Sequence, residues 1–332
     1  MSSFSIPLVR QPKFLAIWLA TILLFLVAPW LAPGSVSASS LLTLSSFAAV
    51  LAIASIGQTL VVQQGGLDLT VPGVISLAAV FVTKFPNGDD ALLLPWTLAA
   101  LATGALSGLV CGIAITLLRV TPLVATLAVN ALLYGFVLYF TRGASTQAVP
   151  QILSDFALLR IGGIPTLAII AVVTLAVVEV IMRASVWGRR FVAIGTSPRA
   201  ARAAGMRVSV YVVGAYVVAG ISYAVAGILL SGYLGVPSLF VGKTYLLPTV
   251  AAVVLGGTSL LGGTGSVVAT AVGAVFLVQL EQETLGMGAP VSVQNIVEAV
   301  IIAVGMALRL VSWGSLRARL LPAGRPQPSS MS

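Results

Sequence analysis

The residues of this chain that could contact a solute are few, and they lie within or beside long apolar runs. They are amides, hydroxyls and one carboxylate: Gln58, Asp68, Thr70, Thr126 and Asn130. Thr126 and Asn130 are one helical turn apart, which places both on one face of a helix. Amide and hydroxyl groups suit a neutral, polyhydroxylated solute better than an ion. We predict that these five residues line a pathway for a small solute.

Asp68 is the least expected of the five, because charge is scarce in this chain. It stands in VVQQGGLDLTVPG, residues 61–73. Pro72 disfavours a helical Val71, so we expect a non-helical break over 64–70 and a helix that begins near Pro72. Asp68 would then accept backbone N–H groups at a helix N-terminus. The alternatives are contact with the solute or a gate, and an ion pair with a cytoplasmic arginine.

Several kinds of chemistry are excluded by residue types that the chain lacks. It has no histidine and one cysteine, Cys111, within an apolar run, so a metal site, a disulfide framework or a hydrolytic enzyme has little to be built from. The sequence Gly242-Lys243-Thr244 ends like a phosphate-binding loop, but Pro237 replaces the first glycine of that motif. We expect no enzymatic activity and no cofactor bound to this chain.

The polar residues must be positioned by helices, and long apolar runs in the sequence predict where those helices lie. The chain is 59% hydrophobic and 8% charged, whereas a soluble domain carries roughly 25% charged residues. Ten runs are candidate spans: 14–32, 41–62, 69–83, 92–118, 121–140, 165–182, 208–231, 244–256, 266–280 and 292–311. The third, eighth and ninth are short for a spanning helix. We predict an all-α polytopic membrane protein with about ten transmembrane helices, some short or broken.

Basic residues predict the orientation of these spans. With the N-terminus in the cytoplasm, thirteen of the 17 lysines and arginines fall in cytoplasmic segments. Both termini are then cytoplasmic, and the net charge of +9 needs no nucleic-acid partner. We expect one membrane domain over 1–332, embedded from about 14 to 311, with a cytoplasmic loop at 183–209 and a cytoplasmic tail at 312–332. The first span is long enough to be retained, and a cleaved signal peptide is the alternative.

The loop at 183–209 contains six arginines and no acid. Within it, Ser197 is suited to cap a short helix with Pro198 at the first helical position, and Gly205 is suited to end it. Arg199 and Arg202 would share one face of that helix. We expect a helix that docks into a groove of a soluble partner. A loop that only fixes topology and a helix on the membrane surface are the alternatives.

Glycine pairs interrupt two of the apolar stretches. The first pair is Gly65 and Gly66, and the second region holds Gly256, Gly257, Gly262 and Gly263. Broken helices at membrane depth are typical of transport pathways, although a tight turn between helices uses glycine equally well. Glycines 104, 108 and 112 repeat at four-residue spacing, which predicts close helix packing.

Four segments, in order, resemble the permeases of ribose-type ABC importers. IGQTLVVQQGGLDLTVPGVISLAAV (56–80) is similar to the segment that reads GGIDLSVG in that family, and TPLVATLAVNALLYGFVLYFTRG (121–143) to its P-x-x-x-x-T-L helix. WGRRFVAIGTSPRAARAAGMRV (187–208) looks like the family's cytoplasmic loop, and LLPTVAAVVLGGTSLLGGTGSVVATAVGAV (246–275) like its C-terminal signature. The resemblance extends from about residue 14 to 311.

This resemblance implies the partners and the place of the protein. The chain would be a binding-protein-dependent inner-membrane component of bacteria, paired with a second permease chain, identical or homologous. A cytoplasmic ATPase would bind ATP and Mg, and an extracytoplasmic solute-binding protein would deliver a monosaccharide of the ribose, xylose or galactose type. Transport would follow alternating access. A branched-chain amino acid, a nucleoside or a signalling sugar is the alternative solute, and a carrier that needs no ATP is a further alternative.

The resemblance also assigns a helix that couples the permease to its ATPase. Carried over by position, it comprises Gly195, Ser197, Arg199, Ala200, Ala201, Arg202 and Gly205. Ser197 and Pro198 depart from the family's pattern, which often has asparagine first, so the docking contacts are expected to differ. Pro72 stands where the family usually has glycine, and it stiffens the start of the third span.

Overall fold

The computed structural model describes residues 12–304 apart from 145, 291, 295, 298, 301 and 302. Its helices, in chain order, are α1 (Pro12–Leu31), η1 (Pro33–Val36), α2 (Ala38–Gln63), α3 (Val71–Thr83), η2 (Asp90–Leu92), α4 (Leu93–Thr116), α5 (Pro122–Thr141), α6 (Gln151–Leu158), α7 (Thr166–Ala184), α8 (Val186–Thr196), α9 (Pro198–Ala203), α10 (Val208–Leu234), η3 (Val241–Tyr245), α11 (Leu246–Leu255) and α12 (Val267–Gly286). The two strands, β1 (Arg160–Ile161) and β2 (Ile164–Pro165), form one antiparallel hairpin.

The predicted all-α membrane architecture is confirmed. Within the described residues, six helices are long and apolar enough to cross a bilayer, and two shorter apolar helices, Val71–Thr83 and Val241–Leu255, accompany them. The first nine predicted runs each coincide with a helix, the ninth being α12. The tenth run is only partly described, and the predicted tail at 312–332 lies outside the described residues.

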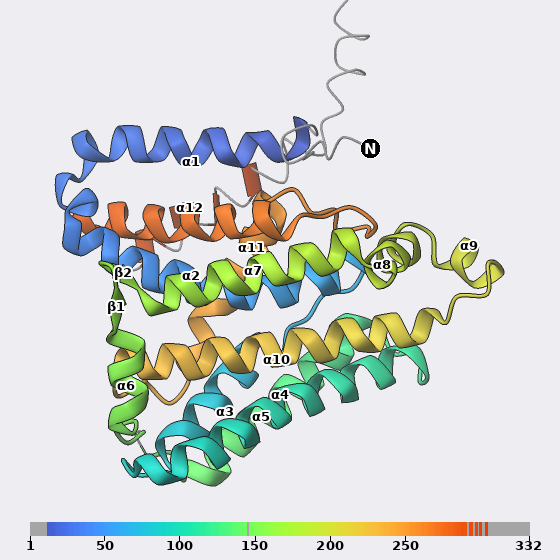
Figure 1. Cartoon of the computed structure of the whole chain (residues 1–332), viewed down its shortest axis with the longest axis horizontal. Helices are drawn as coiled ribbons and strands as arrows, with labels where there is room; N and C mark the ends of the chain where they lie inside the picture. The colour runs from blue at the N-terminus through green and yellow to red at the C-terminus, as the bar shows by residue number, and fades with distance from the viewer. Residues whose placement is uncertain are drawn as a thin grey trace, which may run out of the picture.

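The long helices lie side by side in layers (Figure 1). α1 is outermost on one side, α12 and α11 follow, and α4 and α5 lie on the opposite side, with α2, α7 and α10 between them. The hairpin and α6 lie at one end of this stack, and α8 and α9 lie at the other. Helices α1, α5 and α7 present large apolar side chains to the outside, such as Leu23, Leu132 and Val172, all more than half exposed. Such surfaces are suited to contact with lipid.

Small residues bring the inner helices close together. Gly104 lies against Gly220, Gly108 against the backbone of Tyr216, and Gly112 against Val213, so the glycine repeat of α4 packs on α10 as predicted. α10 also packs against α2 and α3. All thirteen residues of α3 are buried. This short helix is therefore enclosed by protein, the condition under which an incomplete span is tolerated at membrane depth.

Both predicted glycine regions leave helical geometry. α2 ends at Gln63, Gly65 has a φ of +73°, and α3 begins at Val71. Between α11 and α12, Gly257, Gly262 and Gly263 have φ values of +97°, +90° and +81°. Positive φ is the region that glycine enters without a steric penalty, so the backbone itself requires glycine at these turns.

Candidate functional site

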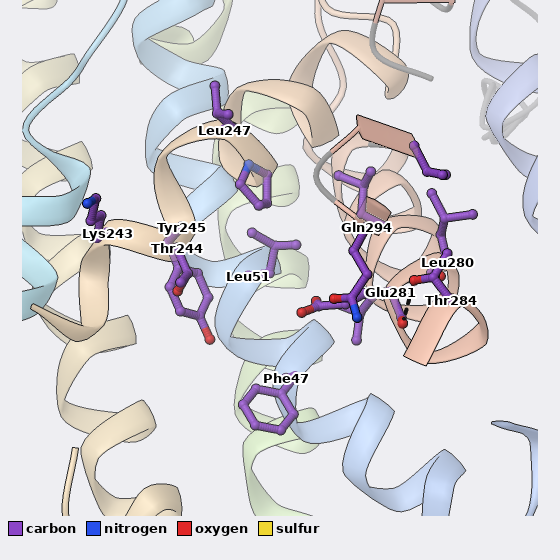
Figure 2. Close-up of a pocket in the computed structure, with 14 residues that line it drawn as sticks. Phe47, Leu51, Lys243, Thr244, Tyr245, Leu247, Leu280, Glu281, Thr284 and Gln294 are labelled. Carbon is purple, nitrogen blue, oxygen red and sulfur yellow. Dashed lines mark hydrogen bonds between the residues drawn. The ribbon is translucent and has the colours of Figure 1, made fainter. Parts of the chain in front are cut away.

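A cavity of about 550 Å³ lies among α2, η3, α11 and α12. Phe47 and Tyr245 contribute aromatic rings to its wall, and Glu281 and Gln294 contribute polar groups (Figure 2). Tyr245 and Glu281 extend toward the same space, whereas the ammonium group of Lys243 points away from it. The remaining walls are mainly apolar. A largely apolar cavity with a few polar groups is the usual form of a small-molecule site.

A second group of polar residues is buried between α2, α3 and α10. Gln58, Asp68 and Thr70 are each 0% exposed. The Tyr223 hydroxyl donates a 2.8 Å hydrogen bond to Oε1 of Gln58, and the Tyr216 hydroxyl lies against Gly66. The structure therefore brings together three of the five predicted pathway residues, and it encloses them in protein. Their contact with a solute stays a prediction.

Asp68 stabilises the turn that precedes α3. Its Oδ1 accepts hydrogen bonds from the backbone N–H of Thr70 at 2.9 Å and from the Thr70 hydroxyl at 2.7 Å. Asp68 thus accepts a backbone N–H group at the N-terminus of α3, as we expected, and the donor is the N-cap residue Thr70. Among the described residues, Asp68 forms no ion pair with an arginine, and the ion pair found there joins Glu179 to Arg183.

Asn130 on α5 caps the first turn of α3. Its Oδ1 accepts a 2.9 Å hydrogen bond from the N–H of Gly73 in the first turn of α3. That N–H has no partner within its own helix. Thr126, one turn earlier, is buried, and its hydroxyl donates to the carbonyl of Pro122. A side chain from a distant span thus anchors the start of the short helix, and the predicted role of both residues in the pathway remains a prediction.

The two glycine breaks meet at one place, which we call the glycine junction: Gln63–Gly65, Gly195–Thr196 and Gly262–Gly263. The N–H of Gly263 donates a 2.9 Å hydrogen bond to the carbonyl of Gln63. Nearby, Nε2 of Gln64 donates at 2.9 Å to the carbonyl of Phe191 on α8. The ends of α2 and α8 and the loop before α12 are therefore joined directly.

The backbones at this junction are too close for larger residues. A Cβ atom at Gly195 would overlap the carbonyl oxygen of Gln63. One at Gly262 would lie 2.8 Å from the carbonyl oxygen of Gly195, and one at Gly263 would lie 2.9 Å from Cα of Thr196. Of the other break glycines, Gly256 lies against the backbone of Thr270. These contacts explain the need for glycine by close approach as well as by turn geometry.

The segment after the junction has the predicted helix. α9 spans Pro198–Ala203, Oγ of Ser197 accepts from the N–H of Ala200 at 3.3 Å, and Gly205 follows with a φ of +78°. Ala201 is buried against Ile194 and Val208. Of the residues predicted for the coupling helix, Arg199, Ala200, Arg202 and Gly205 face outward, and Pro198, Ala203 and Ala204 are exposed beside them. The segment therefore has an apolar attachment and a basic outer face.

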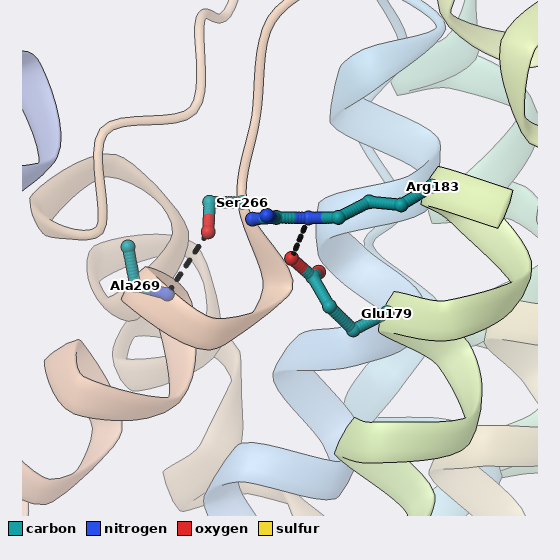
Figure 3. Close-up of polar contacts among 4 residues, drawn as sticks. All are labelled: Glu179, Arg183, Ser266 and Ala269. Atoms are coloured by element: carbon teal, nitrogen blue, oxygen red, sulfur yellow. Dashed lines mark hydrogen bonds and ion pairs between the residues drawn. The ribbon is translucent and has the colours of Figure 1, made fainter. Parts of the chain in front are cut away.

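The end of α7 carries an ion pair between two residues that are one helical turn apart. Arg183 pairs with Glu179 within the helix (Figure 3). α12 is a neighbour of α7 and begins where Oγ of Ser266 accepts a 3.2 Å hydrogen bond from the N–H of Ala269. The intramembrane carboxylate Glu179 is thus neutralised locally, and its role is structural.

Sequence reasoning did not identify four residues of these two sites: Tyr216, Tyr223, Tyr245 and Glu281. A signal existed for the first two, since Tyr216 and Tyr223 are two helical turns apart in an apolar span and share one face. Glu281 directly follows the predicted ninth span, so its position in the sequence indicates a loop residue on the external side. The structure extends α12 past it to Gly286.

Comparison with known proteins identifies the family to which this chain belongs. Residues 40–306 match the family described as "Branched-chain amino acid transport system / permease component". The chain belongs to this family. The permease is therefore a transport component of the bacterial inner membrane and not an enzyme, and the resemblance to ABC importer permeases is confirmed. Permeases of this kind work with an ATPase and a solute-binding protein.

Named relatives cover most of the permease. It is 32% identical over 298 residues to the galactofuranose transporter permease protein YtfT of Escherichia coli (strain K12), covering 88% of this chain and 87% of the relative. It is 33% identical over 272 residues to the probable ABC transporter permease protein y4mJ of Sinorhizobium fredii (strain NBRC 101917 / NGR234), covering 80% of each. Identity to the autoinducer 2 import system permease protein LsrD of Escherichia coli (strain K12) is 32% over 270 residues, covering 78% and 80%. No solved structure matches the permease.

Proposed function

We propose that the permease forms the translocation pathway of an ATP-driven importer for a monosaccharide. The relative named for galactofuranose transport supports a sugar, because the match extends over nearly the whole of both chains. The scarcity of charge among the buried polar residues also favours a neutral solute. The family description and the LsrD relative make a branched-chain amino acid and autoinducer 2 the competing solutes.

The observation that carries the ATP-driven mechanism is the glycine junction. α9 follows Thr196 after one residue, and Gly195 and Thr196 touch both helix breaks. A displacement of α9 by a partner therefore reaches the end of α2 and the loop before α12 without an intervening side chain. Closely packed backbones transmit such a displacement because they cannot be compressed. α9 is the element that receives the force, and the two broken helices are the elements that move.

The other components of the proposed importer are those that the family implies. A cytoplasmic ATPase binds ATP and Mg and docks on the basic face of α9 that Arg199 and Arg202 provide. A second permease chain completes the pathway, and a solute-binding protein delivers the sugar at the opposite end. Rocking of the broken helices then exposes the pathway to one side at a time.

The docking step is tested by co-purification of the permease with its ATPase. We expect Arg199→Glu combined with Arg202→Glu to reduce the co-purified ATPase at least about tenfold, since the charge of the docking face is reversed. The matched control is Arg189→Glu combined with Arg190→Glu, which changes the same charge on exposed residues of α8 in the same loop. This control should retain the ATPase.

Two outcomes contradict the proposal. One is full retention of the ATPase by the α9 double variant. The other is uptake of sugar by the permease alone, reconstituted in liposomes without ATP, which identifies a secondary carrier. In the complete importer, uptake of radiolabelled ribose, galactose and leucine then separates the proposed sugar from an amino acid.

A further inference from the structure

We infer that the cavity among α2, η3, α11 and α12 is the outer solute subsite of the permease, and that Glu281 binds hydroxyl groups of a neutral polyhydroxylated solute there. The inference rests on the proposed import of a sugar. It adds a site on this chain, whereas three of the five residues that the sequence singled out, Gln58, Asp68 and Thr70, lie in the enclosed group around Asp68.

The depth of the cavity fits an outer subsite. Its wall includes Phe47 and Leu51 of α2, and α2 begins at Ala38, the end of the helix nearest the β1–β2 hairpin. At about 1.5 Å per residue, Leu51 lies roughly 20 Å along the helix from Ala38. The hydrocarbon core of a bilayer is about 30 Å thick. The cavity therefore extends from the end predicted to be external toward the middle of the membrane.

The carboxylate of Glu281 has no hydrogen-bond donor or cation paired with it among the described residues. Its side chain is exposed, and the Thr284 hydroxyl donates to the backbone carbonyl of Glu281, not to the carboxylate. Glu283, two residues later on the same helix, is 2% exposed and accepts a 3.0 Å hydrogen bond from Nε2 of Gln279. A free carboxylate accepts hydrogen bonds from adjacent hydroxyl groups, and bonds to a charged acceptor are the stronger kind.

The other walls complete a site for a sugar. Gln294 donates one N–H to the carbonyl of Ala289, which leaves its carbonyl oxygen and its second N–H for a ligand. Phe47 and Tyr245 offer ring faces to the C–H groups of a pyranose or furanose ring, a contact that buries apolar area on both sides. The space of about 550 Å³ exceeds the volume of a monosaccharide and leaves room for water.

Charge argues against an amino acid in the same place. A zwitterion needs a cation opposite Glu281 to bind its carboxylate. Among the described residues, Lys243 is the only basic residue in the cavity wall, and its ammonium group points away from the other polar groups (Figure 2). A neutral polyol meets the acceptor at Glu281 without leaving a second charge unpaired.

Thiol labelling tests the subsite in right-side-out membrane vesicles that contain the complete importer. Cys111, the single cysteine, is buried and is replaced in a Cys111→Ser background. Glu281→Cys should react with a membrane-impermeant thiol reagent, whereas the matched control Glu283→Cys should react at least about tenfold more slowly. Millimolar D-ribose or D-galactose should slow labelling of Glu281→Cys at least about threefold, and the same concentration of mannitol should have a smaller effect.

Each contrary result overturns the inference. Absence of labelling at Glu281→Cys shows that a second chain or lipid fills the cavity. Protection by leucine in place of the sugars shows a site for amino acids. Labelling that no sugar slows, in an importer whose wild-type form takes up that sugar, removes the subsite and leaves the proposed function intact. Failure of the wild-type importer to take up any sugar refutes the proposed function separately.

Discussion

The N–H group of Gly263 donates a hydrogen bond to the carbonyl oxygen of Gln63, at 2.9 Å. The two residues belong to opposite halves of the chain. Gln63 is the last residue of α2, and Gly263 lies in the loop between α11 and α12. Gly195, one residue before the end of α8, lies against the same carbonyl oxygen. A single carbonyl group therefore joins the two breaks to the segment that we propose receives the force of the ATPase.

Enlarging Gly195 should uncouple ATP hydrolysis from solute uptake. In Gly195→Ala the new methyl group overlaps the carbonyl of Gln63, and relief of such an overlap costs about 1–3 kcal/mol. We expect ATP-dependent uptake to fall at least about tenfold while the ATPase still co-purifies, because the outer face of α9 is unchanged. Gly135→Ala on α5 is the control, since nothing lies within 4 Å of its new methyl group. Normal uptake by Gly195→Ala would refute the role of the junction.

Removal of the Asn130 side chain should destabilise α3. Asn130→Ala leaves the N–H of Gly73 without its acceptor in a protein interior, and loss of a helix cap costs about 0.5–2 kcal/mol. The melting temperature of the detergent-solubilised permease should fall measurably. Asn130→Asp keeps an acceptor at the helix N-terminus, so it should retain most of the stability. Equal melting temperatures for the alanine variant and the wild type would contradict the capping role.

The carboxylate of Asp68 should be replaceable by an amide but not by an alkyl group. Asp68→Asn keeps an oxygen that can accept from both donors of Thr70, whereas Asp68→Leu leaves those buried donors unpaired, at about 1–3 kcal/mol for each unsatisfied group. We expect assembly of the importer to survive the first change and fail with the second. Size-exclusion chromatography of the purified complex measures this. Wild-type assembly of the leucine variant would mean that the Asp68 turn is dispensable.

The sequence alone determined the features that depend on neighbouring residues. The apolar runs predicted the spans because transfer of a continuous apolar helix into lipid depends on that segment itself. Pro72 predicted a start of α3 that differs from the observed Val71 by one residue. Ser197, Pro198 and Gly205 predicted the bounds of α9, since caps act within one helical turn.

Only the tertiary structure decided which distant groups meet. The spacing of Thr126 and Asn130 indicated a shared helix face, but not that Asn130 would accept the N–H of Gly73 in the first turn of α3. The glycine pairs indicated breaks, but not that Gln63, Gly195 and Gly263 would touch. The position of Glu281 in a cavity likewise depends on how α2, α11 and α12 pack. Such contacts depend on how whole helices pack against one another, and the preferences of neighbouring residues do not predict that packing.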